Sequence, residues 1–193
     1  FNANVAVGAW STGGNLNTGR PNLAGAGTQT AALAFGGQTP PGNVANTEIY
    51  NGSTWTEVNN LQAARNRLAG AGTSTAALAF GGNAPSASAI TEKWNGTNWT
   101  EVNDLNTARS ELAGAGTQTA AIAMGGTPHA TLTELYNGTN WTAVNVMNTG
   151  RQGFAGCGTT TAALAFGGEA PPATAVTELW NGTNWTEVAD LNT

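Results

Sequence analysis

Glutamates recur along the chain in pairs, a pattern that could support acid–base chemistry. Each of four near-identical phrases, such as TELWNGTNWTEV (177–188), has a glutamate at its second position, and three have another nine residues later. Glycosidases use two facing carboxylates, one of which has a raised pKa. A pair repeated in the same surroundings lacks that asymmetry, so we predict solvated strand positions rather than a catalytic pair. The first series, which also supplies candidate ligand contacts, is Glu48, Glu92, Glu134 and Glu178, and the second is Glu57, Glu101 and Glu187.

Arginine also recurs once per repeat, ahead of a stretch rich in glycine and alanine. A structural arginine would bind backbone carbonyls or a nearby glutamate, whereas a functional one would contact a ligand carboxylate or a sugar hydroxyl. Both interpretations stay open. Arg67 has no obvious counterpart in the other repeats and is predicted to be a solvated surface residue. The recurring arginines are Arg20, Arg65, Arg109 and Arg151.

Aromatic residues occupy two fixed places in each repeat. They could wedge between neighbouring units, each burying about 150–250 Å², or form a repeated platform on which sugars stack. We favour the wedge and keep Trp94 and Trp180 as candidate sugar contacts. The first place holds Tyr50, Trp94, Tyr136 and Trp180, and the second holds Trp55, Trp99, Trp141 and Trp185.

Other chemistry has little support in the residues. His129 is the only histidine and Cys157 the only cysteine, which excludes a disulfide within the chain and gives no cluster of metal ligands. Cys157 replaces an alanine of the other repeats, so we predict a small core residue. We therefore expect no enzyme activity, no metal and no cofactor. Sequons that could accept glycans, or simply form turns, begin at Asn51, Asn95, Asn98, Asn137, Asn140, Asn181 and Asn184.

The composition excludes some partners. Only 9% of the residues are charged, far below the roughly 25% of an average soluble protein. Lys93 is the only lysine and the net charge is −5, so we predict no nucleic-acid binding, which relies on lysine and arginine. No apolar run approaches the ~20 residues of a membrane span, so no membrane insertion is expected.

The spacing of landmarks reveals an internal repeat. Five tryptophans, from Trp10 to Trp185, stand 45, 44, 42 and 44 residues apart, and the arginines and glycine pairs follow the same period. Within the first unit we expect strands at 23–29, 30–37, 47–51 and 54–58, called a to d below. The Asn-Gly pair between strands c and d is typical of a short hairpin. Strand b is apolar on both alternating faces and must be covered on both.

A tandem four-stranded unit of this length is the pattern of a β-propeller blade. We predict an all-β propeller with four complete four-stranded blades at 20–60, 65–104, 109–146 and 151–190. Residues 1–19 would supply an extra strand around Trp10, part of a further blade or a longer array. The chain 1–193 is then a single repeat domain that begins and ends in the same phase.

The landmarks together resemble the kelch motif. The double glycine after strand b, the aromatic in strand c, the tryptophan opening strand d and the arginine before the next strand a all match over residues 20–193. The composition of the repeats, rich in Asn, Thr, Gly and Ala, is also similar to that of kelch-like arrays of bacteria and marine bacteriophages. The resemblance implies a propeller that serves most often as an interaction platform.

Function is expected on one face of the disc. Only the b–c loops differ in length and sequence between the repeats, as in QTPPGNVAN (38–46) and TPHATL (127–132). We expect these loops to lie on the same face of the disc as the arginines. We predict a non-enzymatic binding or structural module, used for adhesion or assembly on an extracellular or virion surface. Its partner would be a protein or glycan, with self-association or continuation into a longer array. The alternative is a multivalent lectin with sites at the blade junctions.

Overall fold

The computed structural model describes residues 12–192, and this part of the chain contains strands and no helix. It therefore holds no helix that could cross a membrane. Sixteen of its strands form four antiparallel sheets of four strands each, and two short ones form a separate hairpin. The strands are β1 (Ala24–Thr28), β2 (Ala31–Phe35), β3 (Gln38–Thr39), β4 (Gly42–Asn43), β5 (Thr47–Tyr50), β6 (Trp55–Val58), β7 (Ala69–Gly72), β8 (Ala77–Phe80), β9 (Thr91–Trp94), β10 (Trp99–Val102), β11 (Ala113–Gly116), β12 (Ala121–Met124), β13 (Thr133–Tyr136), β14 (Trp141–Val144), β15 (Ala155–Gly158), β16 (Ala163–Phe166), β17 (Thr177–Trp180) and β18 (Trp185–Val188).

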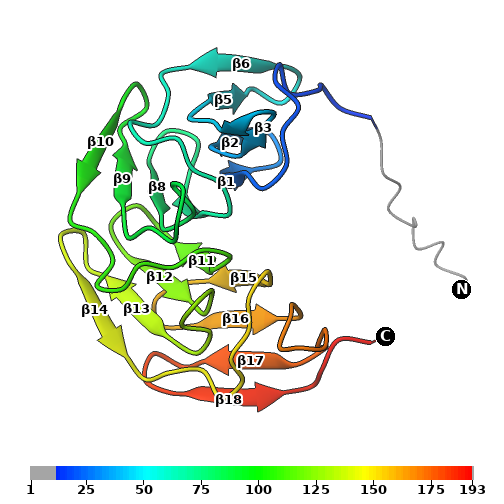
Figure 1. The fold of residues 1–193 in the computed structure, drawn as a ribbon, viewed down its shortest axis with the longest axis vertical. Coiled ribbons are helices and arrows are strands. Elements are labelled where there is room, and N and C mark those ends of the chain that lie inside the picture. Colours follow the sequence, from blue (N-terminus) through cyan, green and yellow to red (C-terminus); the bar gives the residue numbers. More distant parts are fainter. Residues whose placement is uncertain (1–11, 193) are drawn as a thin grey trace, which may run out of the picture.

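Each sheet is one blade of a β-propeller, numbered blade 1 to blade 4 along the chain (Figure 1). Within a blade, strands a to d follow one another in space as in sequence, for example β1-β2-β5-β6. The a strands β1, β7, β11 and β15 contact their neighbours at the centre, and the d strands form the outer rim. The predicted all-β propeller with four four-stranded blades is confirmed. The predicted Trp10 strand lies outside the described residues.

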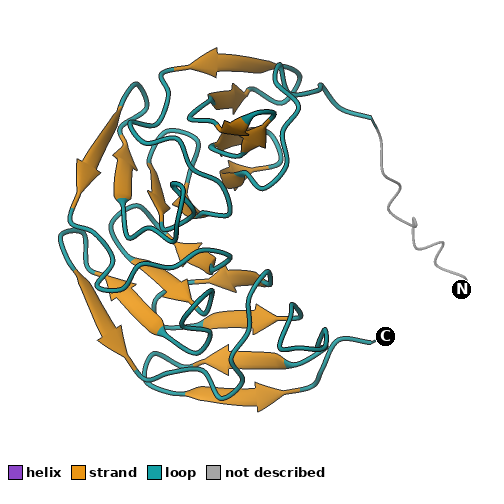
Figure 2. Cartoon of the chain, viewed as in Figure 1, coloured by secondary structure: helices purple, strands orange, loops and turns teal. Residues whose placement is uncertain are grey.

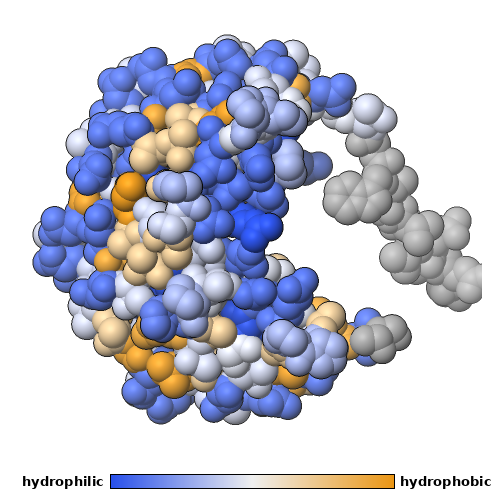
Figure 3. Space-filling view, in the orientation of Figure 1, coloured by the Kyte–Doolittle hydropathy of each residue, from blue (hydrophilic) through white to orange (hydrophobic). Residues whose placement is uncertain are grey.

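The blades form an open arc rather than a closed ring. Blades 1 and 2, 2 and 3, and 3 and 4 touch through their a strands, while a gap separates blade 1 from blade 4 (Figure 2). Hydrophilic residues line much of the concave edge of the arc (Figure 3). Blade 1 and blade 4 therefore each keep one sheet face that no other described blade covers.

Glycine in the a strands allows the blades to approach each other closely. A Cβ added at Gly70 would lie 2.7 Å from the Gly25 carbonyl oxygen, and one at Gly114 would lie 2.5 Å from the Phe80 ring. Such distances are well inside van der Waals contact, so any larger residue would push the blades apart. The density of glycine and alanine in these strands follows from crowding near the axis.

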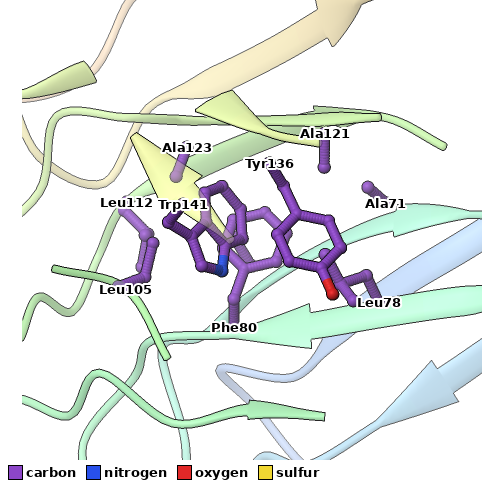
Figure 4. Close-up of a cluster of buried hydrophobic side chains, with 10 residues drawn as sticks. Ala71, Leu78, Phe80, Leu105, Leu112, Ala121, Ala123, Tyr136 and Trp141 are labelled. Atoms are coloured by element: carbon purple, nitrogen blue, oxygen red, sulfur yellow. The ribbon is translucent and has the colours of Figure 1, made fainter. Parts of the chain in front are cut away.

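The three interfaces between blades repeat one apolar arrangement (Figure 4). Between blades 2 and 3, Phe80 packs on Trp141 with ring centroids 4.9 Å apart, and Leu105, Leu112 and Tyr136 complete the cluster. The Trp141 indole also donates a hydrogen bond of 3.1 Å to the Thr91 hydroxyl of the preceding blade. The wedge interpretation is therefore confirmed for the buried tryptophans at these interfaces, Trp99, Trp141 and Trp185.

The c–d turn differs from the two-residue hairpin expected. Four residues, 51–54, connect β5 to β6, and only Gly52 has a positive φ, at 93°. The Asn51 side chain instead accepts backbone hydrogen bonds of 3.0 and 2.9 Å from Ser53 and Thr54. Asparagine recurs here because its side chain closes an Asx turn, not because its backbone must be left-handed.

Candidate functional site

The recurring arginines and the first glutamate series form buried ion pairs inside each blade. In blade 3, Arg109 Nη2 lies 3.0 Å from Glu134 Oε1, and both side chains are fully buried. Arg109 Nη1 also donates to the carbonyls of Gly125 (2.7 Å) and Leu132 (3.0 Å). The same pairing occurs in every blade, as Arg20–Glu48, Arg65–Glu92, Arg109–Glu134 and Arg151–Glu178.

The glutamate also holds the linker that enters its blade. The second oxygen of Glu134 accepts hydrogen bonds of 2.8 Å from both the backbone and the side-chain nitrogen of Asn106. The prediction that this series is solvated is therefore wrong, because a paired carboxylate with several donors can be buried. The pairs join the linker to strand c, and no polar atom of theirs faces solvent to meet a ligand.

Burial perturbs the arginines, and the glutamates oppose that effect. Desolvation lowers the pKa of the Arg65, Arg109 and Arg151 guanidinium groups, whereas the charge and hydrogen bonds of their glutamate partners raise it. Arginine remains protonated throughout. Each pair therefore contains a permanent cation, and its stability in the interior depends on one carboxylate.

Acid is expected to weaken the fold through Glu48. Burial raises the pKa of this carboxyl, but hydrogen bonds from Arg20, Asn17 and Thr18 outweigh it, and the pKa lies below its usual value. A carboxyl with a lowered folded-state pKa stabilises the fold above its unfolded pKa, and this stabilisation is lost as the pH falls through the folded value. We expect the free energy of unfolding to drop below about pH 4.

Denaturant unfolding at several pH values, from neutral to strongly acidic, tests this expectation. Glu48→Gln should lose less stability on acidification than the parent, because the variant has no carboxyl to protonate there. Thr56→Ala, which changes an exposed residue of the neighbouring strand β6 that carries no titratable group, should keep the parent's pH dependence. Identical pH dependence in the parent and in Glu48→Gln would contradict the assignment.

The candidate sugar contacts Trp94 and Trp180 are also buried. Both lie in interfaces between blades, and their indoles donate to the carbonyls of Ser74 (3.1 Å) and Thr160 (2.9 Å). Neither ring presents a face on which a sugar could stack. The blade junctions are therefore occupied by core residues rather than by ligand sites.

A different set of residues surrounds an open cleft at the propeller axis. The cleft has a volume of about 490 Å³ and lies where the linkers enter the a strands. We call it the axial cleft. Its lining residues are Asn22, Arg67, Leu68, Glu111, Leu112, Gln152, Gly153, Phe154 and Glu169.

Four of these residues occupy one equivalent position in the four blades, two residues after the buried arginine. All four have a left-handed backbone, with φ of 59° at Asn22, 53° at Arg67, 57° at Glu111 and 58° at Gly153. Backbone hydrogen bonds join them across the blades: Arg67 N to Asn22 O (2.8 Å), Glu111 N to Arg67 O (2.9 Å) and Gly153 N to Glu111 O (2.9 Å). The position is thus built identically in each blade while its side chain changes.

Side chains of both charge signs line the axial cleft. Arg67 forms an ion pair with Glu111 of the next blade, with side chains 46% and 20% exposed. Gln152 accepts a hydrogen bond from the Thr127 hydroxyl and donates one of 3.4 Å to Glu169. With one arginine and two glutamates, the cleft is polar, partly solvated and slightly negative.

Sequence reasoning missed the axial cleft. Arg67 was expected to have no counterpart, yet Asn22, Glu111 and Gly153 take its place in the other blades. The available signal was a variable residue inside a constant frame, between the arginine and the Leu or Phe that directly precedes each strand a. The b–c loops do join this face, since Asn66 N donates to the carbonyl of Asn83 (3.2 Å) at the start of such a loop.

The two remaining single residues have different outcomes. Cys157 is exposed, so the prediction of a core residue is wrong, because no described blade covers the face of blade 4 on which it lies. His129 is exposed in its b–c loop. Among residues 12–192, no three His, Cys, Asp or Glu side chains are grouped to hold a metal ion.

Comparisons with known proteins add no assignment. No protein-family model matches the sequence, and a search of curated proteins finds no significant match.

Proposed function

We propose that the chain is a kelch-type propeller that binds a protein ligand at the axial cleft without catalysing a reaction. The kelch landmarks support this assignment, since the buried arginine, the glycine pair and the tryptophan that opens strand d recur in each blade. We place the protein on an extracellular or virion surface, in adhesion or assembly. Its low charge, with only 9% charged residues, is the property that motivates this location.

One observation carries the binding proposal: four different residues occupy the same left-handed position around one cleft. Glycine adopts this backbone at no steric cost, as Gly153 does, whereas an L-residue with a side chain is strained there by about 1–2 kcal/mol. A pure scaffold would use glycine or asparagine, which both tolerate this backbone, in every blade. The chain instead keeps Arg67 and Glu111 in two of the four blades, so we infer that these two side chains are retained for their contacts.

The chemistry of the cleft favours a protein segment over a glycan. Its cation and carboxylates suit the mixed charges of a peptide, and Leu68 and Leu112 provide an apolar floor. The one aromatic ring of the lining, Phe154, has the Arg151 guanidinium over it, 5.6 Å from its centroid, so one face is not free for sugar stacking.

Selection from a displayed random-peptide library, in parallel with a glycan array, tests the proposal. We expect the chain to select peptides whose affinity falls about tenfold or more in Arg67→Ala and in Glu111→Ala. Glu101→Ala, which removes an exposed glutamate on the outer strand β10, should leave the affinity within about twofold.

Peptide binding that ignores both cleft variants would overturn the cleft assignment. Binding of glycans alone, lost in the same variants, would move the ligand class to the lectin alternative. Turnover of a bound compound would overturn the non-enzymatic proposal.

A further inference from the structure

Blade 4 presents an apolar face that the other blades bury. Leu179, Val188 and Leu191 are 39%, 39% and 47% exposed. Their counterparts in blade 3, Leu135, Val144 and Met147, pack against blade 4 in the third interface. We call the side of blade 4 that carries these three residues and Thr177 the free face. Apolar side chains grouped in this way mark an interaction surface.

An unpaired hydroxyl on the free face indicates what should cover it. In each internal interface, the first threonine of strand c accepts a hydrogen bond from the indole of the next blade: Trp99 to Thr47 (3.0 Å), Trp141 to Thr91 (3.1 Å) and Trp185 to Thr133 (3.0 Å). The equivalent Thr177 hydroxyl is buried and has no partner among the described residues. The position therefore fits a tryptophan N–H from a fifth blade.

Blade 1 carries the complementary surface, here called the open face. The Tyr50 and Trp55 rings pack in a tilted arrangement with centroids 5.0 Å apart, like the Trp94 and Trp99 rings at 5.3 Å. The Trp94–Trp99 pair is buried against blade 1, whereas Tyr50 and Trp55 remain partly exposed. Among residues 12–192, no acceptor bonds the Trp55 indole. The open face thus offers the donor that Thr177 lacks.

A second pair of positions matches these two faces to each other. The internal interfaces share a side-chain hydrogen bond between asparagines: Asn59 to Asn98 (2.8 Å), Asn103 to Asn140 (2.7 Å) and Asn145 to Asn184 (2.8 Å). At the equivalent places, blade 4 has Ala189 and blade 1 has Thr54. Because both partners change together, joining these faces leaves no amide unpaired.

We infer that the free face of blade 4 binds the open face of blade 1 in a second copy of this chain. Trp55 of the second copy would insert against Leu179 and Val188 and donate to the Thr177 hydroxyl. Blade 1 needs no linker from its neighbour, because its own Asn17 already bonds Glu48 (2.6 Å). Residues 189–191 and the second copy's residues 14–16 occupy the same place in the repeat, with Gly14 close to the Ser53 carbonyl, so docking requires one of these two segments to move aside.

Such a contact is head-to-tail, since it joins two different surfaces. Repetition closes into a ring if the rotation allows it and otherwise extends into a filament. The inference does not depend on the axial cleft, because the residues that line the cleft belong to neither the free face nor the open face.

Sedimentation velocity of the purified chain over a wide range of concentrations tests the inference. We expect dimers or longer species to form with increasing concentration. Leu179→Asp should weaken the association about tenfold or more, because it places a charge against Trp55. Val146→Asp is the matched control, since Val146 is 52% exposed on the linker after blade 3 and outside both faces.

Cys157 supplies a second readout in the unmodified chain. Its counterparts Ala71 and Ala115 are buried by the next blade, whereas Cys157 is exposed. Maleimide labelling of Cys157 should therefore slow as the parent associates and should stay fast in Leu179→Asp. A monomer at every concentration, with labelling independent of concentration, would overturn the inference. Association that Leu179→Asp does not weaken would also overturn it.

Discussion

Glu134→Ala is expected to lower the free energy of unfolding by about 3–5 kcal/mol, the range for removing one partner of a buried ion pair. The variant leaves the fully buried Arg109 guanidinium without its carboxylate and removes the acceptor of the Asn106 backbone N–H. Equilibrium unfolding in guanidinium chloride, followed by tryptophan fluorescence, measures the loss. The expected effect is large because the interior cannot solvate the remaining cation.

Two further variants distinguish the cost of leaving a buried charge unpaired from the cost of losing an ion pair as such. Arg67→Ala breaks the ion pair with Glu111, which is partly exposed, and should cost less than about 1 kcal/mol. The double variant Arg109→Met/Glu134→Met removes both charges and should recover much of the stability lost in Glu134→Ala. A loss in Glu134→Ala as small as that in Arg67→Ala would contradict the structural role of the pair.

Trp141→Ala should destabilise the protein by about 3–5 kcal/mol, as expected for truncating a buried tryptophan. The substitution empties the centre of the interface between blades 2 and 3, where the indole packs on Phe80 and Tyr136 (Figure 4). It also leaves the Thr91 hydroxyl without its donor. Thermal unfolding monitored by circular dichroism measures the effect.

The chain provides a matched variant at the same repeat position. Trp55→Ala removes the equivalent tryptophan from the open face of blade 1, where the indole is only partly buried, so the loss should be clearly smaller. The comparison is made at a concentration where the chain is monomeric. Equal losses in the two variants would show that the contact with the preceding blade is not what stabilises the indole of Trp141.

The four-blade propeller was predictable because its signals are local and repeated. Strand b is apolar on both faces, and a tryptophan opens each strand d, so pairing within a blade and burial between blades follow from one 44-residue unit such as 55–98. Repetition then confirms each assignment several times. The strand bounds differ from those expected by one or two residues, as for β1 at Ala24–Thr28.

The buried arginine–glutamate ion pairs could be suggested from the sequence, but their burial could not be predicted. An arginine paired with a nearby glutamate was one of two interpretations, and the repeated glutamates were predicted to be solvated because every copy has the same surroundings. Arg109 and Glu134 are separated by 25 residues, and their burial depends on the linker folding over strand c. Local periodicity describes one sheet face and does not reveal what another segment lays over it.

Only the tertiary structure determined which residues line the axial cleft and which side chains of blades 1 and 4 are exposed. Arg67 and Glu111 are 44 residues apart and meet because the a strands converge at the axis with the same left-handed turn before each of them. Cys157 has the sequence surroundings of a core alanine, yet it is exposed. The sequence by itself determined the blade and its repetition, because these depend on neighbouring residues. Which side chains face solvent depends on which blade packs beside them, a property of the whole arc.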